Sequence, residues 1–319
     1  MKKFLKYSLL VILIIILIFI SQNYPASADA KDLPLLSDTS HLRRSLELIT
    51  NTTAARNYQN TDVLDTTAER IRQEFLKSTG RVSFQNYKVG EKEYKNVIAS
   101  FGPGDGERII VGAHYDVCGD QEGADDNASG VAGILELATL LKNKTLKYRI
   151  DLVAYTLEEP PYFNTSEMGS YVHAKSLHDA DVPIKGMISI EMIGYYSDDK
   201  NSQDYPIGVM KWIYGDKGNY ITIVQKSFCG AFAKQFKKLS FKNNSIPTKA
   251  FRAPSFFGGI GLSDHKNYWK FGYSAVMVTN TAFFRNHNYH EQTDKLPTLN
   301  IPKMAQTIDG IFRALTQIE

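Results

Sequence analysis

The chain is 319 residues long and close to electrically neutral. It holds 37 Lys and Arg against 34 Asp and Glu, a formal charge of +3, and 43% of its residues are hydrophobic. This composition is typical of a chain with a packed core and excludes a disordered protein. The small net charge gives no support for a nucleic-acid partner.

The first 28 residues have the pattern of a targeting segment. Lys2, Lys3 and Lys6 precede an apolar run over residues 8–20, and Ala26-Ser27-Ala28 offers small residues for cleavage. We therefore predict a signal peptide over residues 1–28 and a secreted or extracellular protein. The alternative is an uncleaved N-terminal anchor, although the run is shorter than the roughly 20 residues of a spanning helix. Residues 29–319 contain 34 basic and 34 acidic residues, so the positive charge belongs to the predicted signal.

Residues 29–60 are polar and weakly periodic, and regular elements follow them. Apolar spacing predicts a helix over residues 62–77 and alternation predicts a hairpin over residues 81–101. Further strands are expected at 108–113, 149–156, 185–190 and 273–279, and further helices at 128–142, 168–179, 224–239, 264–271 and 301–318. Strands that alternate with helices indicate an α/β fold with three layers, in which helices cover both faces of a mostly parallel, mixed sheet. No linker divides residues 29–319, so we predict one catalytic domain.

Ionisable residues cluster where the predicted strands end. His114-Tyr115-Asp116 follows one apolar run, and Glu158-Glu159 follows another and is followed at once by two prolines. Residues 123–130, Gly-Ala-Asp-Asp-Asn-Ala-Ser-Gly, precede a predicted helix, and Glu191 and His290 come further along. Ligands in an α/β sheet bind at the carboxyl ends of its strands. Histidine and carboxylate ligands together suit zinc.

These residues are sufficient for two zinc ions. We assign Asp125 as the bridging carboxylate, His114 and Glu191 to one ion, and His290 and Glu159 to the other. Three carboxylates and a bridging hydroxide balance the four positive charges of two Zn²⁺. Glu158 is not needed as a ligand, so we assign it as the general base. Asp116 is the expected acceptor for the second ring N–H of His114.

The same motifs resemble those of the secreted bacterial di-zinc aminopeptidases. This leucyl aminopeptidase-like family shares a superfamily with glutamate carboxypeptidase and the transferrin receptor ectodomain. The resemblance runs from about Asn96 to the C-terminus. It implies a zinc exopeptidase fold, the same metal and base roles, and a cis peptide between Asp125 and Asp126. The chain departs from the family at Glu191, where many relatives have Asp.

The expected function is therefore a zinc-dependent metallo-aminopeptidase that hydrolyses N-terminal residues from peptides through a metal-bridging hydroxide. Its partners would be peptides with a free N-terminus. One alternative is a carboxypeptidase, for which Arg252 and Arg285 are candidate clamps of the substrate carboxylate. The others are a glutaminyl cyclase-like enzyme with one zinc ion and a non-catalytic binding ectodomain on the same fold.

Several residues keep more than one interpretation at this level. His265 and His287 are rival ligands, and the resemblance suggests that Ser263 orients His290. The aromatic pairs belong either to the core or to a substrate pocket: Tyr195-Tyr196, Phe256-Phe257 and Phe283-Phe284. Cys118 and Cys229 either form one disulfide or stay free.

Overall fold

The computed structural model describes Tyr7, residues 26–208 and residues 210–319. Within these residues nine strands form one mixed sheet in the order β1-β8-β7-β9-β6-β4-β5-β3-β2. The strand bounds are β1 Ser27–Ala28, β2 Val82–Val89, β3 Lys92–Phe101, β4 Arg108–His114, β5 Arg149–Tyr155, β6 Ile184–Glu191, β7 Ile221–Lys226, β8 Thr248–Ala253 and β9 Ala275–Thr279. The predicted α/β fold is confirmed.

The centre of the sheet is parallel and its margins are mixed. β5, β4, β6 and β9 run side by side in parallel, with Val111 opposite both Leu152 and Ile188. These strands are almost continuous runs of apolar residues, because helices cover both of their faces. The β2–β3 hairpin, the β3–β5 pair, the β7–β9 pair and the β1–β8 pair are antiparallel. Parallel pairing therefore aligns the carboxyl ends of β4, β5 and β6 at one edge.

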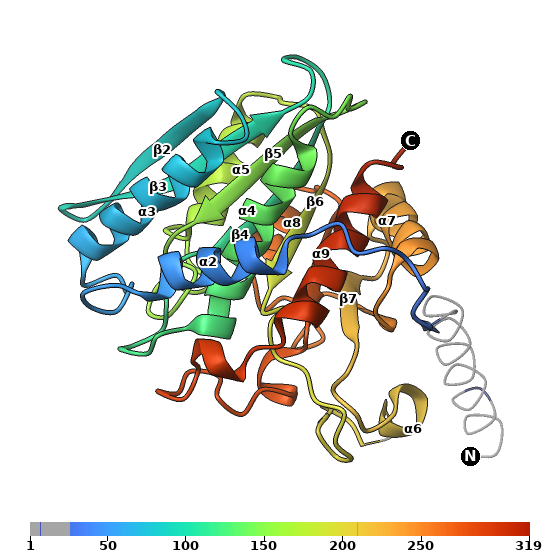
Figure 1. Ribbon diagram of the computed structural model, residues 1–319. Helices are drawn as coiled ribbons and strands as arrows, with labels where there is room; N and C mark the ends of the chain where they lie inside the picture. The colour runs from blue at the N-terminus through green and yellow to red at the C-terminus, as the bar shows by residue number, and fades with distance from the viewer. Residues whose placement is uncertain (1–6, 8–25, 209) are drawn as a thin grey trace.

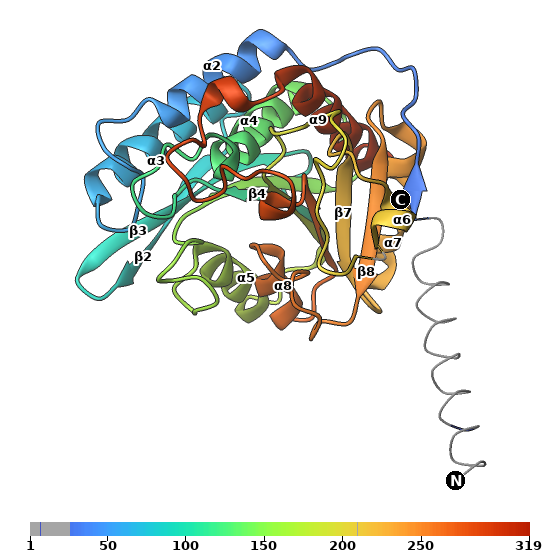
Figure 2. The same ribbon diagram turned by 90° about the horizontal axis from the view of Figure 1, so that it is seen from below.

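Helices form the two outer layers (Figures 1 and 2). Their bounds are α2 Thr39–Thr50, α3 Thr61–Leu76, α4 Gly130–Leu141, α5 Gly169–Asp179, α6 Met210–Tyr214, α7 Gly230–Asn243, α8 His265–Lys270 and α9 Ile301–Leu315. Figure 2 shows α2, α4 and α9 on one side of the sheet and α5 and α8 on the other. The larger apolar core lies under the first group, and a smaller core lies under α5 and α8.

Most predicted elements are confirmed, but strand β8 and helix α6 were not predicted, and two further segments differ from the prediction. The weakly periodic residues 29–60 contain α2, whose Leu42, Leu46 and Ile49 are fully buried. The helix predicted over residues 224–239 instead begins at Gly230, because Ile221–Lys226 forms strand β7 inside the sheet. A strand and a helix cannot be separated by composition alone in a short apolar run.

The buried charge of α4 is paired with the N-terminal part of the chain. Glu136 is 1% exposed, accepts the backbone N–H of Asp38 at 2.8 Å and lies 2.5 Å from Nδ1 of His41. A buried carboxylate is tolerated when such partners are supplied. The contacts of Glu136 with Asp38 and His41 therefore hold α2 against α4.

The predicted signal segment lies mostly outside the described residues and remains a prediction. Of its last residues, Ser27 and Ala28 form β1, which pairs with β8 at the sheet edge. Across the part of the chain that is described, no helix combines the length and apolar character needed to cross a membrane.

Candidate metal centre

The carboxyl ends of three adjacent parallel strands supply the centre. His114 is the last residue of β4, Glu191 is the last residue of β6, and Glu158 and Glu159 follow β5. His290 comes from the loop after β9. The predicted location at the strand ends is therefore observed, and these five side chains meet in one place although up to 176 positions separate them in the sequence.

Two groups of ligand-type atoms face each other across one carboxylate. Nε2 of His114 lies 3.4 Å from Oδ1 of Asp126 and 3.5 Å from Oε2 of Glu191. Nε2 of His290 lies 3.3 Å from Oδ2 of Asp126 and 3.2 Å from Oε2 of Glu159. The two oxygens of Asp126 thus face one histidine each, as a carboxylate between two ions requires.

Asp125 does not occupy this bridging position, and its placement from the sequence must be corrected. Its Oδ1 accepts the Gly194 N–H at 2.8 Å, and its Oδ2 accepts Nδ2 of Asn280 and of Asn286, each at 2.8 Å. With all these donors its carboxylate is directed away from both histidines. Adjacent aspartates in a buried loop point in different directions, and the sequence alone does not say which one faces the centre.

The predicted cis peptide between Asp125 and Asp126 is wrong by one residue. The non-proline cis peptide joins Asp126 and Asn127. These residues belong to a π-helical turn, Ala124–Ser129, in which the backbone of Asp126 and Asn127 is not helical. The same one-residue shift therefore affects both the cis bond and the bridging carboxylate.

Two residues that carried no predicted role hold this loop in place. Asp294 accepts the backbone N–H of Asp125 at 2.9 Å and that of Asp126 at 3.0 Å. Arg56 is 1% exposed and donates to four backbone carbonyls. These acceptors are Ile49, Tyr115, Glu122 and Gly123. Asp294 lies only four positions after His290, so its role could have been predicted from this proximity in the sequence. Arg56 is distant from every motif, and only its burial in the fold reveals its role.

Asp116 fixes the pair of glutamates. Its Oδ1 and Oδ2 accept the backbone N–H groups of Glu158 and Glu159, each at 3.1 Å. Nδ1 of His114 lies 3.1 Å from the backbone oxygen of Asp116 and 3.6 Å from its carboxylate. The expected orienting role of Asp116 is thus provided mainly by its carbonyl, while its carboxylate sets the turn after β5.

Backbone strain accompanies the same residues. Leu157, which precedes Glu158, has φ 59°, Met192, which follows Glu191, has φ 49°, and His290 itself has φ 59°. Non-glycine residues adopt such values at a cost, and they concentrate at functional sites. The strain is therefore consistent with a site that requires fixed side-chain directions.

The electrostatics of the cluster favour bound positive charge. Burial raises the pKa of Glu159 to about 8 and that of Glu158 well above its usual value, with neighbouring carboxylates adding to both shifts. Burial opposes the charged form of His290, yet Asp126 and Glu159 raise the pKa of that imidazole to about 10. A buried group of carboxylates is stable when cations neutralise it.

Unpaired polar atoms show that the residues fit metal ions. Oδ2 of Asp126, Oε1 of Glu159 and Nε2 of His290 are buried without a hydrogen-bond partner. Buried polar atoms are rarely left in this state, and a bound ion would satisfy all three of them. The donor set of imidazole nitrogens and carboxylate oxygens suits zinc.

A pocket with a largely apolar lining opens beside the centre. It is reached by Asp126, Glu158, Glu159, Glu191 and His290 at one side. The rest of its lining includes Phe163, Tyr205, Met210, Tyr214, Val224, Phe251, Phe257, Met277, Phe283, Phe284 and Tyr289. Among the three aromatic pairs, Phe257, Phe283 and Phe284 therefore line the pocket. Tyr196 is 8% exposed and belongs to the core.

Four further residues of open interpretation now have defined positions. Nε2 of His265 lies 2.6 Å from the carbonyl oxygen of Ile260, away from the cluster. Ser263 donates to Oε2 of Glu191 at 2.7 Å rather than to His290, so its predicted partner is wrong. Cys118 and Cys229 are both free thiols.

Comparisons with known proteins find similar sequences and similar folds. The sequence profile of peptidase family M28 matches residues 96–315. The chain is 42% identical over 290 residues to the uncharacterized protein YfbL of Escherichia coli, covering 88% of this chain and 89% of that protein. Its fold is similar to that of the LapA aminopeptidase of Legionella pneumophila, with a TM-score of 0.67, 20% identity and coverage of 89% and 71%. It is also similar to a glutaminyl cyclase of Bacteroides thetaiotaomicron, with a TM-score of 0.68, 14% identity and coverage of 90% and 100%.

Proposed function

The chain belongs to peptidase family M28, and we propose that it is a zinc-dependent aminopeptidase that removes N-terminal residues from peptides. The observation that carries the proposal is the position of Asp126, whose two oxygens each face one histidine at 3.3–3.4 Å. Such an arrangement is suited to two ions that share a carboxylate.

The proposed ligand set differs from the sequence-based one at a single position. His114, Glu191 and Asp126 would hold one Zn²⁺, and His290, Glu159 and the second oxygen of Asp126 would hold the other. Ser263 supports Glu191 through its 2.7 Å hydrogen bond, which fixes the longer side chain that replaces Asp here. When bound, the ions would lower the pKa of a water and polarise the scissile carbonyl.

Glu158 is the residue we propose as general base. Its carboxylate is 4.0 Å from Nε2 of His114 and borders the pocket, while Asp116 fixes its backbone. It lies in a cluster with His114 and Glu159, within reach of an attacking water, and the proposed ligand sets do not require it. It would take the proton of that water and pass it to the leaving amine.

The surroundings favour recognition of an N-terminus over a C-terminus. Carboxylates form part of the pocket lining, and a protonated α-amino group is their natural partner. A carboxypeptidase would instead need a cation. Arg285 is 1% exposed and its guanidinium donates to Gln203 and to the carbonyl of Tyr220, and Arg252 donates to Gln225; neither borders the pocket. Lys249 does line the pocket, but its ammonium group donates to the carbonyl of Tyr214. The apolar lining would accept a large apolar first side chain.

Matched peptides test the proposal. Purified protein with added Zn²⁺ should release the first residue of Leu- or Phe-initiated peptides and leave the same peptides intact when their N-terminus is acetylated. C-terminal amidation should have little effect. Cleavage of only the acetylated peptides would contradict an aminopeptidase. Cyclisation of an N-terminal glutamine with no peptide hydrolysis would establish the cyclase alternative instead.

A further inference from the structure

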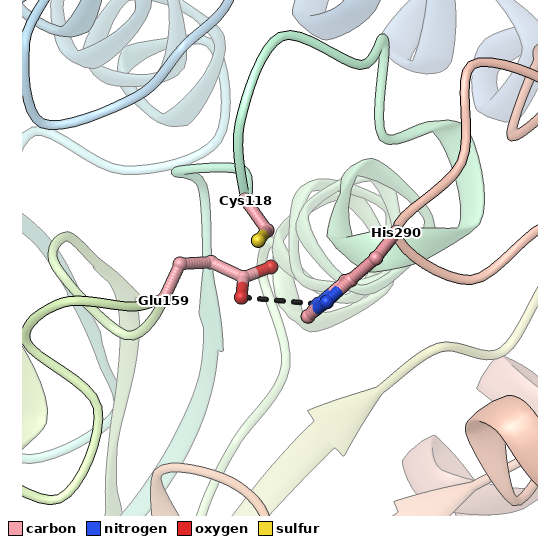
Figure 3. A group of neighbouring side chains, drawn as sticks. All are labelled: Cys118, Glu159 and His290. Atoms are coloured by element: carbon pink, nitrogen blue, oxygen red, sulfur yellow. Dashed lines mark ion pairs between the residues drawn. The ribbon is translucent and has the colours of Figure 1, made fainter.

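A cysteine lies beside one half of the candidate metal centre. Cys118 lies in the loop after β4, four positions beyond His114. Its sulfur, a carboxylate oxygen of Glu159 and a ring nitrogen of His290 all lie within 4.8 Å of one another. Figure 3 shows the sulfur next to the Glu159 carboxylate, whose ion pair with His290 is drawn from the other carboxylate oxygen.

Three atoms around this sulfur form no hydrogen bond, although His290 forms ion pairs with Asp126 and Glu159. Oε1 of Glu159, Nε2 of His290 and Oδ2 of Asp126 are all buried and form no hydrogen bond. Glu159 is 4% exposed, so water does not readily satisfy it. Buried atoms in this state indicate that a ligand binds among them. The sulfur of Cys118 is a further atom near Glu159 and His290 that can bind a metal ion.

The distances require little rearrangement. Zinc bonds of about 2.3 Å to sulfur and about 2.0 Å to nitrogen place two of its ligands at most about 4.3 Å apart. The present separations are within 4.8 Å, so a small shift of these side chains would bring them to ligand distances. The ring of Tyr289 stacks on that of His290 with centroids 3.8 Å apart, which holds the imidazole while the thiol moves.

The two halves of the centre therefore differ in chemistry. The first groups His114, Asp126 and Glu191, which offer only nitrogen and oxygen. The second groups Cys118 with Glu159 and His290. We propose that Cys118 is a sulfur ligand of the ion held by Glu159 and His290. This inference rests on the proposed function, because it assumes that the centre binds divalent metal ions.

Coordination would form one sulfur–metal bond and release one proton from the thiol to solvent, because only the thiolate binds a metal. Soft sulfur selects thiophilic ions such as Zn²⁺ and Cd²⁺, whereas oxygen and nitrogen sites accept Mn²⁺ more readily. The Cys118 half should therefore prefer Zn²⁺ and Cd²⁺ over Mn²⁺, and the His114 half should discriminate less.

Cobalt spectroscopy tests the proposal without reference to activity. Apo-protein is titrated with Co²⁺, and the near-ultraviolet thiolate-to-cobalt charge-transfer band is recorded together with bound metal. Wild type should develop the band with one of its two equivalents. Cys118→Ser should bind Co²⁺ without the band and should hold one Zn²⁺ about tenfold or more weakly, with little change for Mn²⁺.

Cys229→Ser is the matched control. Cys229 is 2% exposed, and its thiol contacts Gln225 outside the centre. This variant retains Cys118 as its single thiol, so a band that persists in it assigns the sulfur ligand even if Cys118→Ser folds poorly. Circular dichroism checks folding in each case.

The outcomes separate the two proposals. Binding of Co²⁺ by wild type without a charge-transfer band would overturn the role of Cys118 and leave the aminopeptidase proposal intact. A band in wild type that disappears in Cys229→Ser would also overturn it. A band with only one bound equivalent would support Cys118 and contradict the two-ion centre. A folded protein that binds no divalent ion would contradict both.

Discussion

At the scale of single residues, neighbours in the sequence have distinct environments. Asp125 and Asp126 are both fully or almost fully buried. Asp125 accepts hydrogen bonds from amide and backbone donors, whereas Asp126 faces two imidazoles. Glu158 and Glu159 show the same division, since only Glu159 lies 3.2 Å from His290. Such differences are tested by substitutions that keep side-chain size and remove one charge.

The glutamate pair gives the first prediction. Glu158→Gln should retain bound metal and lose about 10²–10⁴-fold in kcat with little change in KM, because only the proton acceptor is removed. Glu159→Gln should lose metal affinity as well as rate. Metal content by elemental analysis is measured beside steady-state kinetics. Near-normal kcat in Glu158→Gln, or loss of zinc from that variant alone, would show that the two roles are exchanged.

The aspartate pair gives the second. Asp126→Asn should weaken binding of both ions, because the carboxylate between the two histidines loses its charge. Asp125→Asn should mainly lower the free energy of unfolding, since the new amide cannot accept all the hydrogen bonds that Gly194, Asn280 and Asn286 donate. Isothermal titration with Zn²⁺ and urea unfolding separate the two effects. If Asp125→Asn alone lost metal, our correction of the bridging residue would be wrong.

At the scale of elements, the N-terminal part of the chain supports the centre from outside the region that matches the family profile. Arg56 lies between α2 and α3 and ties the loop after β4 to the loop before α4 through backbone carbonyls. Burial lowers the pKa of its guanidinium to about 10. The residue remains a cation at neutral pH, and its hydrogen bonds are therefore charge-assisted.

The third prediction concerns this arginine. Arg56→Met should lower the free energy of unfolding by about 3 kcal/mol, because several buried carbonyls lose their donor. It should also weaken metal binding indirectly, through looser loops. Arg44→Met is the control, since that side chain is 64% exposed and its contact with Asp38 is 3.8 Å long. Equal unfolding midpoints for the two variants in urea would contradict the structural role of Arg56.

At the scale of the whole molecule, stability should depend on pH through the smaller core. Burial lowers the pKa of His173 in α5 and of His265 in α8 from 6.5 to about 4. Nδ1 of His173 lies 2.6 Å from the hydroxyl of Tyr268, which in turn meets the hydroxyl of Tyr155 at 2.7 Å. Both imidazoles are thus neutral parts of the packing under the sheet.

The fourth prediction follows from the sign of these shifts. Between about pH 6.5 and pH 4 the unfolded chain binds more protons than the folded one, so stability is complete above pH 6.5 and declines as the pH falls through this window. From pH 7 to pH 5 each histidine should contribute a loss of about 1–2 kcal/mol. Urea unfolding of wild type and His173→Gln measures the difference in slope.

His178 provides the control for this measurement, because its ring is 55% exposed and lies outside the smaller core. His178→Gln should change the pH dependence less than His173→Gln does. A His173→Gln protein with an unchanged slope would show that burial of this imidazole does not control acid stability.

The sequence by itself determined the α/β class, the buried strands of the sheet centre and the clustering of histidines and glutamates at strand ends. Apolar runs bounded by turns define such strands locally, and parallel pairing then places their carboxyl ends together. It did not define α2 or β7, because their apolar residues are few or ambiguous between helix and strand. Only the tertiary structure decided which adjacent aspartate faces the histidines, that Arg56 braces the loops, and that Cys118 meets Glu159 and His290. Those facts depend on side-chain direction and on contacts between residues far apart in the chain, and neither is encoded in local spacing.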